Sequence, residues 1–531
     1  MALELNEKLP ASTESPTAYL DPPRLNTFSF RPVSPLECEL IIKKLKLTKT
    51  DVNSLPVKLL IKLCSYVSRP LALLINSSFD TGIFPESLKI ARITPIFKKG
   101  ERHDPSNYRP VASLPILSKI IERCAVNQLI SFCDLHSIFY KHQYGFQKGK
   151  STSDALIELT ENLYSNLNAK KTTLCILIDL QKAFDTVHHD TLLTKMDVLG
   201  VRGLSLDWFR NYLLNRKQYV SIGSAVSNVK TTVIGLPQGS IIGPILFLLY
   251  INDIPKSSSM KTLLFADDST FTISDKIPLS ILSSLDDQLN RVKTWCTSNK
   301  LTINAGKTEL IKFSNSKNEM LNFEITFSGT RVNLVEDCKF LGVTLDSDLT
   351  FSKHIKSITA KLSRSCGVLY KLKKLLPQQA RMNYYYGLMY PYLTYNIIVW
   401  GSTNPSHLNL LIILQKRIVR ILAGSEYLAH STPLFLKLSI LKLLDLHKYF
   451  VCMYMFDERN REDFSINHNL NTRNRNNLQP KFHRLSKTQH ALSYVGPKIW
   501  NDLPCNIKSV RSLPIFKRKL RNYLLSSYGE L

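Results

Sequence analysis

The segment Cys175–Asp185 has the sequence CILIDLQKAFD, and the segment Leu263–Phe271 has the sequence LLFADDSTF. In the first segment, a β-branched, apolar strand ends at Asp179. In the second, Asp267 and Asp268 occupy a tight turn between two apolar strands. Carboxylates beside buried strands are costly unless something compensates them, and a divalent cation is the usual solution. These segments predict two neighbouring strands of one sheet that bring three carboxylates together.

Carboxylates arranged in this way could hold two Mg²⁺ ions about 3.5–4 Å apart, the spacing that serves in-line phosphoryl transfer. One ion would activate a 3′-hydroxyl, and the other would bind a triphosphate and its leaving pyrophosphate. An Asp-Asp pair at a turn also has a purely structural explanation, because Asp favours turns through local hydrogen bonds. The equivalent strand-end position of Asp179 favours the metal site.

The composition favours a polyanionic partner. The 531 residues include 69 Lys and Arg against 42 Asp and Glu, a formal net charge of +27. Such an excess is typical of proteins that bind nucleic acid or an anionic surface, although a basic soluble protein without such a partner is the simpler alternative. The length predicts two to four domains.

A membrane partner and a structural zinc site are not expected. The longest apolar run, Ile241–Ile251, is interrupted by Gly243 and Pro244 and is shorter than the ~20 residues that a spanning helix needs. The ten cysteines include no CxxC pair, which predicts reduced, mostly buried thiols.

Hydrophobic periodicity predicts a mixed α/β fold. Strands are expected over residues 89–97, 173–179, 219–222 and 230–234, in a hairpin over 261–272, and in two further strand pairs before 345. Helices are expected over 36–47, 55–79, 116–135, 151–168, 190–214, 240–252 and 277–299, and almost continuously over 352–456.

Five motifs follow one another over residues 177–346: LIDLQKAFDTVHHDTLL, GLPQGSIIGPILFLLYINDIP, FADDSTF, LTINAGKTELIKF and FLGVTLD. They resemble the palm motifs of reverse transcriptases from non-LTR retrotransposons, especially the jockey-like branch. ITPIFKKG, NYRPVASLP and QYGFQKGKSTSDAL resemble the fingers motifs of the same family, and YVGPKIWNDLP resembles one of its C-terminal segments.

The resemblance implies an α/β (α+β) fold of the right-hand polymerase type. Its divisions would be an extended lead-in at 1–35, a helical extension at 36–78, fingers and palm at 79–346, a helical thumb at 347–430 and a basic region at 431–531. The last 61 residues carry 12 Lys and Arg against one Asp and one Glu, so this tail could hold RNA or simply form a solvated charged surface.

The implied activity is that of an RNA-directed DNA polymerase that copies the element's RNA during retrotransposition. Its partners would be an RNA template, a DNA primer, their hybrid and dNTPs, and its cofactor two Mg²⁺, with Mn²⁺ as a substitute. Asp179, Asp267 and Asp268 would be the metal ligands, together with the backbone carbonyl of Leu180. Lys307 would protonate the departing pyrophosphate.

The resemblance also implies nucleotide contacts. Lys98, its neighbour Lys99 and Arg109 would bind the triphosphate, since Arg grips phosphate bidentately. Phe184 would exclude a 2′-hydroxyl, and Gln238 would lie beside the incoming nucleotide between two glycines that allow close backbone approach. From the residues alone, Phe184 would be a core aromatic and Gln238 part of a turn. The two lysines and Arg109 could belong to a solvated basic loop.

Contacts to the template and primer are implied at two further places. Lys148 and Lys150 stand where the family commonly has arginines, so charge is kept but bidentate geometry is lost. Leu341 and Gly342 would form the primer-grip turn. Asp185 is expected to cap local structure rather than to bind metal.

Three alternatives to this assignment are less favoured. GFQKGKS has one residue too few between its glycines for a phosphate-binding loop and lacks a preceding strand. An intron-encoded enzyme would have a different C-terminal region. A catalytically inactive, nucleic-acid-binding remnant is disfavoured because all three carboxylates are present. We also expect no endonuclease in this chain, hence no nicking of its own target, and a nuclear and cytoplasmic location.

Overall fold

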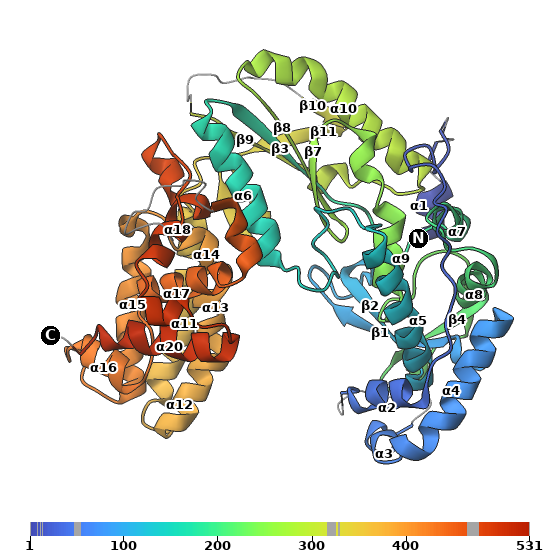
Figure 1. Ribbon diagram of the computed structural model, residues 1–531, viewed down its shortest axis with the longest axis horizontal. Coiled ribbons are helices and arrows are strands. Elements are labelled where there is room, and N and C mark those ends of the chain that lie inside the picture. Colours follow the sequence, from blue (N-terminus) through green and yellow to red (C-terminus); the bar gives the residue numbers. More distant parts are fainter. Residues whose placement is uncertain are drawn as a thin grey trace.

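The computed structural model describes residues 2–7, 9–10, 12, 14–46, 55–315, 325–327, 330–464 and 477–529. Within these residues the strands form a five-stranded, a six-stranded and a two-stranded sheet. Figure 1 shows an arch, in which the six-stranded sheet connects an N-terminal α/β part to a C-terminal group of helices. The mixed α/β fold expected from the periodicity is confirmed.

The first five described helices lie in the N-terminal part: α1 (Ala2–Glu7), α2 (Pro35–Lys43), α3 (Val57–Lys62), α4 (Cys64–Thr81) and α5 (Ile116–Leu135). The lead-in over 1–35 is therefore not wholly extended, since it begins with a short helix. The helix expected over 55–79 is two helices, because the backbone at Leu63 (φ −96°, ψ 10°) leaves the helical conformation.

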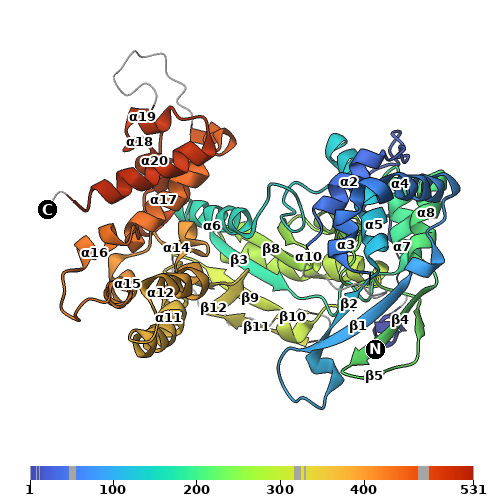
Figure 2. The ribbon, with the colours of Figure 1, turned by 90° about the horizontal axis from the view of Figure 1, so that it is seen from below.

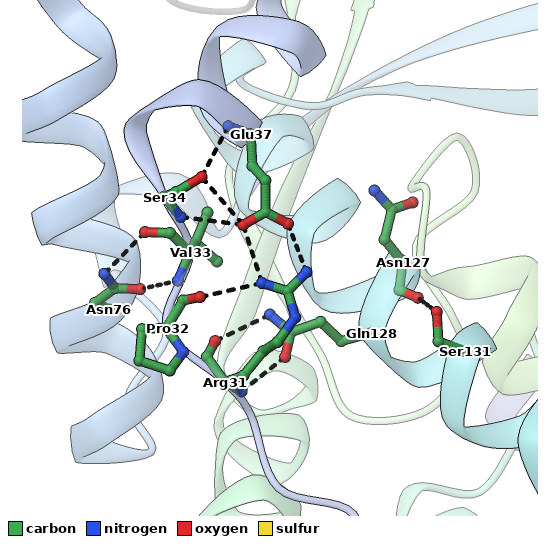
Figure 3. Close-up of polar contacts among 9 residues, drawn as sticks. All are labelled: Arg31, Pro32, Val33, Ser34, Glu37, Asn76, Asn127, Gln128 and Ser131. Atoms are coloured by element: carbon green, nitrogen blue, oxygen red, sulfur yellow. Dashed lines mark hydrogen bonds and ion pairs between the residues drawn. The ribbon is translucent and has the colours of Figure 1, made fainter.

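Two amide side chains fasten the lead-in to helices α4 and α5 (Figure 3). Gln128 of α5 accepts a hydrogen bond from the Arg31 N–H at 2.8 Å and donates one to the Arg31 carbonyl at 3.1 Å. Asn76 of α4 bonds both backbone groups of Val33, at 2.7 and 3.1 Å. The Arg31 side chain pairs with Glu37 of α2 at 2.6 Å. The path of the chain into α2 is thus fixed from both sides.

The five-stranded sheet has the order β2-β1-β4-β5, with β6 also paired to β4. Strand β1 runs antiparallel to β2 and parallel to β4. The strands expected over 219–222 and 230–234 are present as β4 and β6, but β6 pairs with residues 216–218 of β4, ahead of the expected stretch. The bounds are β1 (Ile90–Phe97), β2 (Tyr108–Ser113), β4 (Arg216–Ile222), β5 (Ala225–Val226) and β6 (Lys230–Thr232).

The helix expected over 190–214 is interrupted, forming α7 (His189–Val198) and α8 (Gly203–Leu213). Gly200 has φ +103°, and a side chain there would collide with the backbone carbonyl of Asn26. The Phe28 N–H donates to the Gly200 carbonyl at 2.8 Å. The lead-in therefore packs against the chain at this point, and a left-handed glycine makes the approach possible.

The six-stranded sheet has the order β10-β11-β9-β3-β8-β7, and its central strand β3 is antiparallel to both neighbours. Alternate residues of β3 face different cores: Leu174 and Ile176 pack with helices α9 and α10, and Cys175 packs with α6. The bounds are α6 (Thr152–Asn168), β3 (Thr172–Ile178), α9 (Gly243–Ile251), β7 (Lys261–Phe265), β8 (Asp268–Asp275), α10 (Pro278–Ser298), β9 (Glu309–Phe313), β10 (Ile325–Phe327) and β11 (Thr330–Val335).

After the hairpin β12 (Asp337–Phe340) and β13 (Val343–Asp346), the chain is helical, as expected. Figure 2 shows these helices gathered at the end of the sheet opposite the N-terminal part. Their bounds are α11 (Ser352–Leu372), α12 (Gln378–Tyr384), α13 (Tyr390–Thr394), α14 (Ile397–Trp400), α15 (Pro405–Ala423), α16 (Ser431–Lys437), α17 (Leu443–Met455), α18 (Leu492–Asn501), α19 (Cys505–Lys508) and α20 (Leu513–Ser526).

The described part of the expected basic region, 431–464 and 477–529, packs on the same core as the helices before it. Phe516 of α20 and Trp500 of α18 are buried together, with ring centroids 5.9 Å apart. Residues 465–476 lie outside the described ranges. All ten cysteines are free and nine are buried, as expected, with Cys505 exposed. None of the described helices has the length and apolarity needed to cross a membrane.

Candidate active site

The three predicted carboxylates lie at one end of the six-stranded sheet. Strand β3 ends at Ile178, which pairs with Ser269 of β8, so Asp179 follows at the height of Asp268. Asp267 occupies the turn between β7 and β8 after Ala266, which has the left-handed φ of +56°. The antiparallel register of two adjacent strands thus brings the acidic side chains together, as predicted.

The pKa values of the acidic turn reflect this crowding. Burial raises the pKa of Asp268 to about 6, and the charges of Asp267 and Asp179 add to the effect. Burial also raises the pKa of Asp267, where Asp179 acts in the same direction and Arg109 in the opposite one. Like charges held close together favour binding of a cation. The burial of Asp268 is partial, and enough of the residue is exposed for a cation to reach it.

Asp179 is held by the loop before β9. Asn304 donates a side-chain hydrogen bond to Asp179 Oδ2 at 2.9 Å, and its backbone N–H donates to the Asp179 carbonyl at 2.8 Å. The Nζ of Lys307 lies 3.4 Å from the same Oδ2. Leu180, the next residue, forms an isolated bridge with Ile303. Sequence reasoning predicted Lys307 and missed Asn304, three residues earlier in the same motif.

The donor set fits hard divalent cations, which prefer carboxylate oxygens. Among the described residues, no three His, Cys, Asp or Glu side chains already surround a common metal position. Asp179 is instead paired with the ammonium of Lys307. A cation bound by all three carboxylates would therefore require Asp179 to move from its contact with Lys307.

Gln238 is fixed by Asp185, to which its side-chain amide donates at 2.7 Å. Burial raises the pKa of Asp185 against this hydrogen bond. The two glycines flank the loop as expected: a Cβ on Gly235 would lie 2.5 Å from the Asp185 carbonyl oxygen, and one on Gly239 would lie 2.5 Å from that of Ala112. A cavity of about 420 Å³ opens beside Gln238, toward strands β1, β4 and β6.

Phe184 lies at the margin of the core. Its ring stacks on Phe247 of α9, with centroids 4.3 Å apart, and meets the exposed ring of Phe146 edge-on at 6.2 Å. The side chain is half-buried, so it both packs and presents an edge to solvent.

The predicted phosphate-binding cations lie on β2 and on the loop before it. Arg109 is exposed on β2, near enough to Asp267 for its charge to lower the pKa of that carboxyl. Lys98 and Lys99 are exposed beyond the end of β1, and the Lys98 N–H donates to the Asn107 carbonyl at 2.9 Å. Arg109 therefore lies close enough to Asp267 to interact with it electrostatically, whereas the two lysines lie in a solvated loop.

Lys150 serves the loop that contains it. Its Nζ donates to the carbonyls of Lys141 at 2.6 Å and Gln143 at 2.8 Å, and it lies over the ring of Tyr144. Burial lowers the pKa of this amine. Of the two lysines expected to contact a template, only Lys148 is fully exposed.

Leu341 and Gly342 form the turn of the β12–β13 hairpin, both with positive φ, +43° and +83°. The hydroxyl of Tyr395 donates to the Leu341 carbonyl at 2.7 Å, and its ring lies against Gly342. The predicted primer-grip turn is thus docked on the helical part through a residue that sequence reasoning did not single out.

The family model for reverse transcriptase (RNA-dependent DNA polymerase) matches residues 96–345. This range contains the three carboxylates and the loops around them. Residues 96–345 belong to the reverse transcriptase family. The predicted resemblance of the motifs to those of reverse transcriptases is therefore confirmed.

Individual relatives extend the similarity beyond that range. The chain is 30% identical to the RNA-directed DNA polymerase from mobile element jockey of Drosophila melanogaster, over 80% of this chain and 48% of the relative. It is 29% identical to a probable RNA-directed DNA polymerase from transposon BS of the same fly, over 77% and 47%. The chain thus spans about half the length of the curated relatives it matches. The predicted resemblance to jockey-like, non-LTR elements is confirmed.

Among solved structures, the crystal structure of the RNA-dependent RNA polymerase of a human picobirnavirus aligns with 79% of this chain and 77% of its own, with 11% identity and a TM-score of 0.40.

Proposed function

We propose that this chain acts as an RNA-directed DNA polymerase that copies an element's RNA into DNA during retrotransposition. It would transfer a nucleotide from a dNTP to a primer 3′-hydroxyl, with an RNA template and a DNA primer as partners. The convergence of Asp179 with Asp267 and Asp268 at one sheet end carries this proposal, because such a set serves in-line phosphoryl transfer. The net charge of +27 suits binding of the RNA–DNA hybrid.

Asp179, Asp267 and Asp268 would hold two Mg²⁺, or Mn²⁺ in their place. When bound, these ions supply activation of the 3′-hydroxyl and stabilisation of the leaving pyrophosphate. Lys307, whose Nζ lies 3.4 Å from Asp179 Oδ2, would give a proton to that pyrophosphate. Exchange of Lys307 for the cation at Asp179 would free its ammonium for this task.

Four further residues would bind the incoming dNTP. Arg109 and Lys98 would neutralise the triphosphate from the N-terminal side. Gln238, oriented by Asp185, would contact the nucleotide next to the template base. Phe184, backed by the ring of Phe247, would leave no room for a 2′-hydroxyl.

In this proposal the five-stranded sheet and its helices are the fingers, the six-stranded sheet is the palm, and α11–α15 form the thumb. The divisions are an N-terminal lead-in and helical extension (1–35 and 36–78), fingers and palm (79–346), thumb (347–430) and a basic C-terminal region (431–531) that would hold RNA.

Template and primer contacts complete the proposal. Leu341 and Gly342 would seat the primer end, and Lys148 would contact the template, with Lys150 supporting its loop. We place the enzyme in the nucleus and cytoplasm, where such elements are copied and integrated.

Primer extension on an RNA template with Mg²⁺ and dNTPs tests this function. The full chain should incorporate nucleotides, and Asp267→Ala should reduce the rate by about a thousandfold or more while primer–template binding persists. Equal incorporation by both proteins would refute the assignment of the carboxylates. Binding without incorporation by the unaltered chain would instead indicate a nucleic-acid-binding remnant.

A further inference from the structure

The segment before α6 lies along the outer edge of the six-stranded sheet. Gln143 forms an isolated parallel bridge with Leu264 of β7. The Tyr144 N–H donates to the Leu264 carbonyl at 2.8 Å, and the Leu264 N–H donates to the His142 carbonyl at 3.0 Å. Residues 142–144 thus continue the sheet beyond β7, up to the turn that carries two of the carboxylates.

The side chain of Gln143 is 2% exposed and grips this turn directly. Its Oε1 accepts hydrogen bonds from the N–H of Ala266 at 3.0 Å and from the N–H of Gly145 at 2.9 Å. Only the oxygen end of an amide can accept two N–H groups, so the orientation of the amide follows from its partners. Ala266 immediately precedes Asp267 and has a φ of +56°, a backbone conformation that requires support from its surroundings.

We propose that Gln143 is a positioning residue that holds the backbone of Ala266, so that Asp267 and Asp268 keep the direction needed for metal binding. The inference rests on the proposed polymerase function. Gln143 itself touches neither nucleotide nor metal in this account and acts through the acidic turn.

The neighbours of Gln143 make the grip rigid. A side chain on Gly145 would collide with the backbone nitrogen of Ala266, so the two segments are in direct backbone contact. His142 and Tyr144 both hydrogen-bond to Glu158 of α6. Side chains alternate along an extended segment, so these two anchor it to the helix while Gln143 faces the turn. Burial opposes ionisation of Glu158, but the bonds from His142 and Tyr144 lower its pKa to about 2.

The other end of the amide argues against a role in stability alone. Gln143 Nε2 is buried, and within the described residues it has no hydrogen-bond partner. An unpaired buried donor costs free energy. Gln128, by contrast, uses both ends of its amide on the backbone of Arg31 (Figure 3). Gln143 therefore forms hydrogen bonds through its oxygen end, and both go to the backbone around the acidic turn.

The test compares Gln143→Met with Gln128→Met, a buried glutamine that also bonds backbone groups but lies away from the carboxylates. The full-length variants would extend a DNA primer on an RNA template over a Mg²⁺ titration. We expect Gln143→Met to raise the half-saturating Mg²⁺ concentration about fivefold and to lower kcat about tenfold, with unchanged primer–template affinity. Gly145→Ala should shift the Mg²⁺ dependence in the same direction, whereas Gln128→Met should not shift it.

The inference would be overturned if Gln143→Met and Gln128→Met lost active enzyme to the same extent and neither changed the Mg²⁺ dependence. Hydrogen–deuterium exchange over residues 264–269 gives a second readout that does not need activity. We expect faster exchange in Gln143→Met and unchanged exchange in Gln128→Met. If exchange were unchanged in both variants, Gln143 would not hold the backbone of Ala266, even if the chain extends primers. Failure of the unaltered chain to extend primers would count against the proposed function alone.

Discussion

Lys307 and Asp179 form an ion pair at the centre of the site, with the lysine Nζ 3.4 Å from the carboxylate Oδ2. The side chains are 62% and 38% exposed, so the pair contributes little to stability. Its importance is chemical. The lysine stands where a cation would compensate Asp179, and the same ammonium is within reach of a leaving pyrophosphate in the proposed reaction.

Replacement of Lys307 by alanine should therefore affect turnover rather than folding. We expect kcat to fall about 10²-fold or more, the usual contribution of a general acid, with a melting temperature close to that of the parent. Steady-state primer extension and thermal melting measure both. Lys58→Ala, at an exposed lysine of α3, is the matched control. A kcat equal to that of the control would remove Lys307 from the chemistry.

The acidic turn should make the stability of the metal-free protein depend on pH. Folding raises the pKa of Asp268 from 3.8 to about 6, so protonation of this carboxyl stabilises the folded protein. This stabilisation is fully present below pH about 4 and is lost as the pH rises through about 6. Asp268→Asn should melt at a higher temperature than the parent at pH 7.5 in EDTA, and the two should converge at low pH. A constant difference across this range would contradict the pKa shift.

Mg²⁺ should restore the stability that is lost when Asp268 ionises, because the ion binds the folded state. We expect added Mg²⁺ to raise the melting temperature of the parent chain and to have a much smaller effect on Asp268→Asn. Equal stabilisation of both proteins would mean that Mg²⁺ binds elsewhere.

Asp185 should govern nucleotide affinity through Gln238. Asp185→Ala removes the acceptor of the 2.7 Å hydrogen bond, whereas Asp185→Asn retains an acceptor oxygen. We expect the alanine variant to raise the KM for dNTP about tenfold and the asparagine variant to stay within about twofold, with primer–template affinity unchanged in both. The test is primer extension at varied dNTP concentration. An identical KM in all three proteins would show that Gln238 needs no such support.

Phe184 should select against ribonucleotides. Phe184→Val replaces the ring that stacks on Phe247 with a smaller aliphatic side chain. We expect the preference for dNTP over rNTP in kcat/KM to fall about tenfold or more. Phe30→Val is a matched control, because Phe30 is also half-buried and stacks on Phe79 at 4.0 Å. If both variants keep the preference of the parent, Phe184 is a packing residue only.

The sequence was most informative where local patterns and the fold agree. The apolar run before Asp179 and the acidic turn at Asp267 were predicted as β3 and the β7–β8 hairpin, and the periodicity over 116–135 predicted α5 with its observed bounds. At the start of α6, the Ser151 side chain accepts from the Asp154 N–H in a capping box. These features depend on residues close together in the chain.

Features that depend on distant contacts were missed. The interruption at Gly200 depends on Asn26, which lies on the lead-in. Lys150 and Arg109 are both basic residues near family motifs, yet only the fold shows that carbonyls of its own loop occupy Lys150. Neither Asn304 nor Gln143 stands out by residue type, because their contacts with Asp179 and Ala266 join segments more than 100 residues apart.

A crystal structure of the chain with primer–template, a non-reactive dNTP analogue and Mn²⁺ tests the central claim most directly. Anomalous scattering should locate two ions about 3.5–4 Å apart, each bound by oxygens of Asp179, Asp267 or Asp268. Lys307 should then have left Asp179. Ions bound away from these carboxylates, or Asp179 still paired with Lys307 beside a bound nucleotide, would contradict the account.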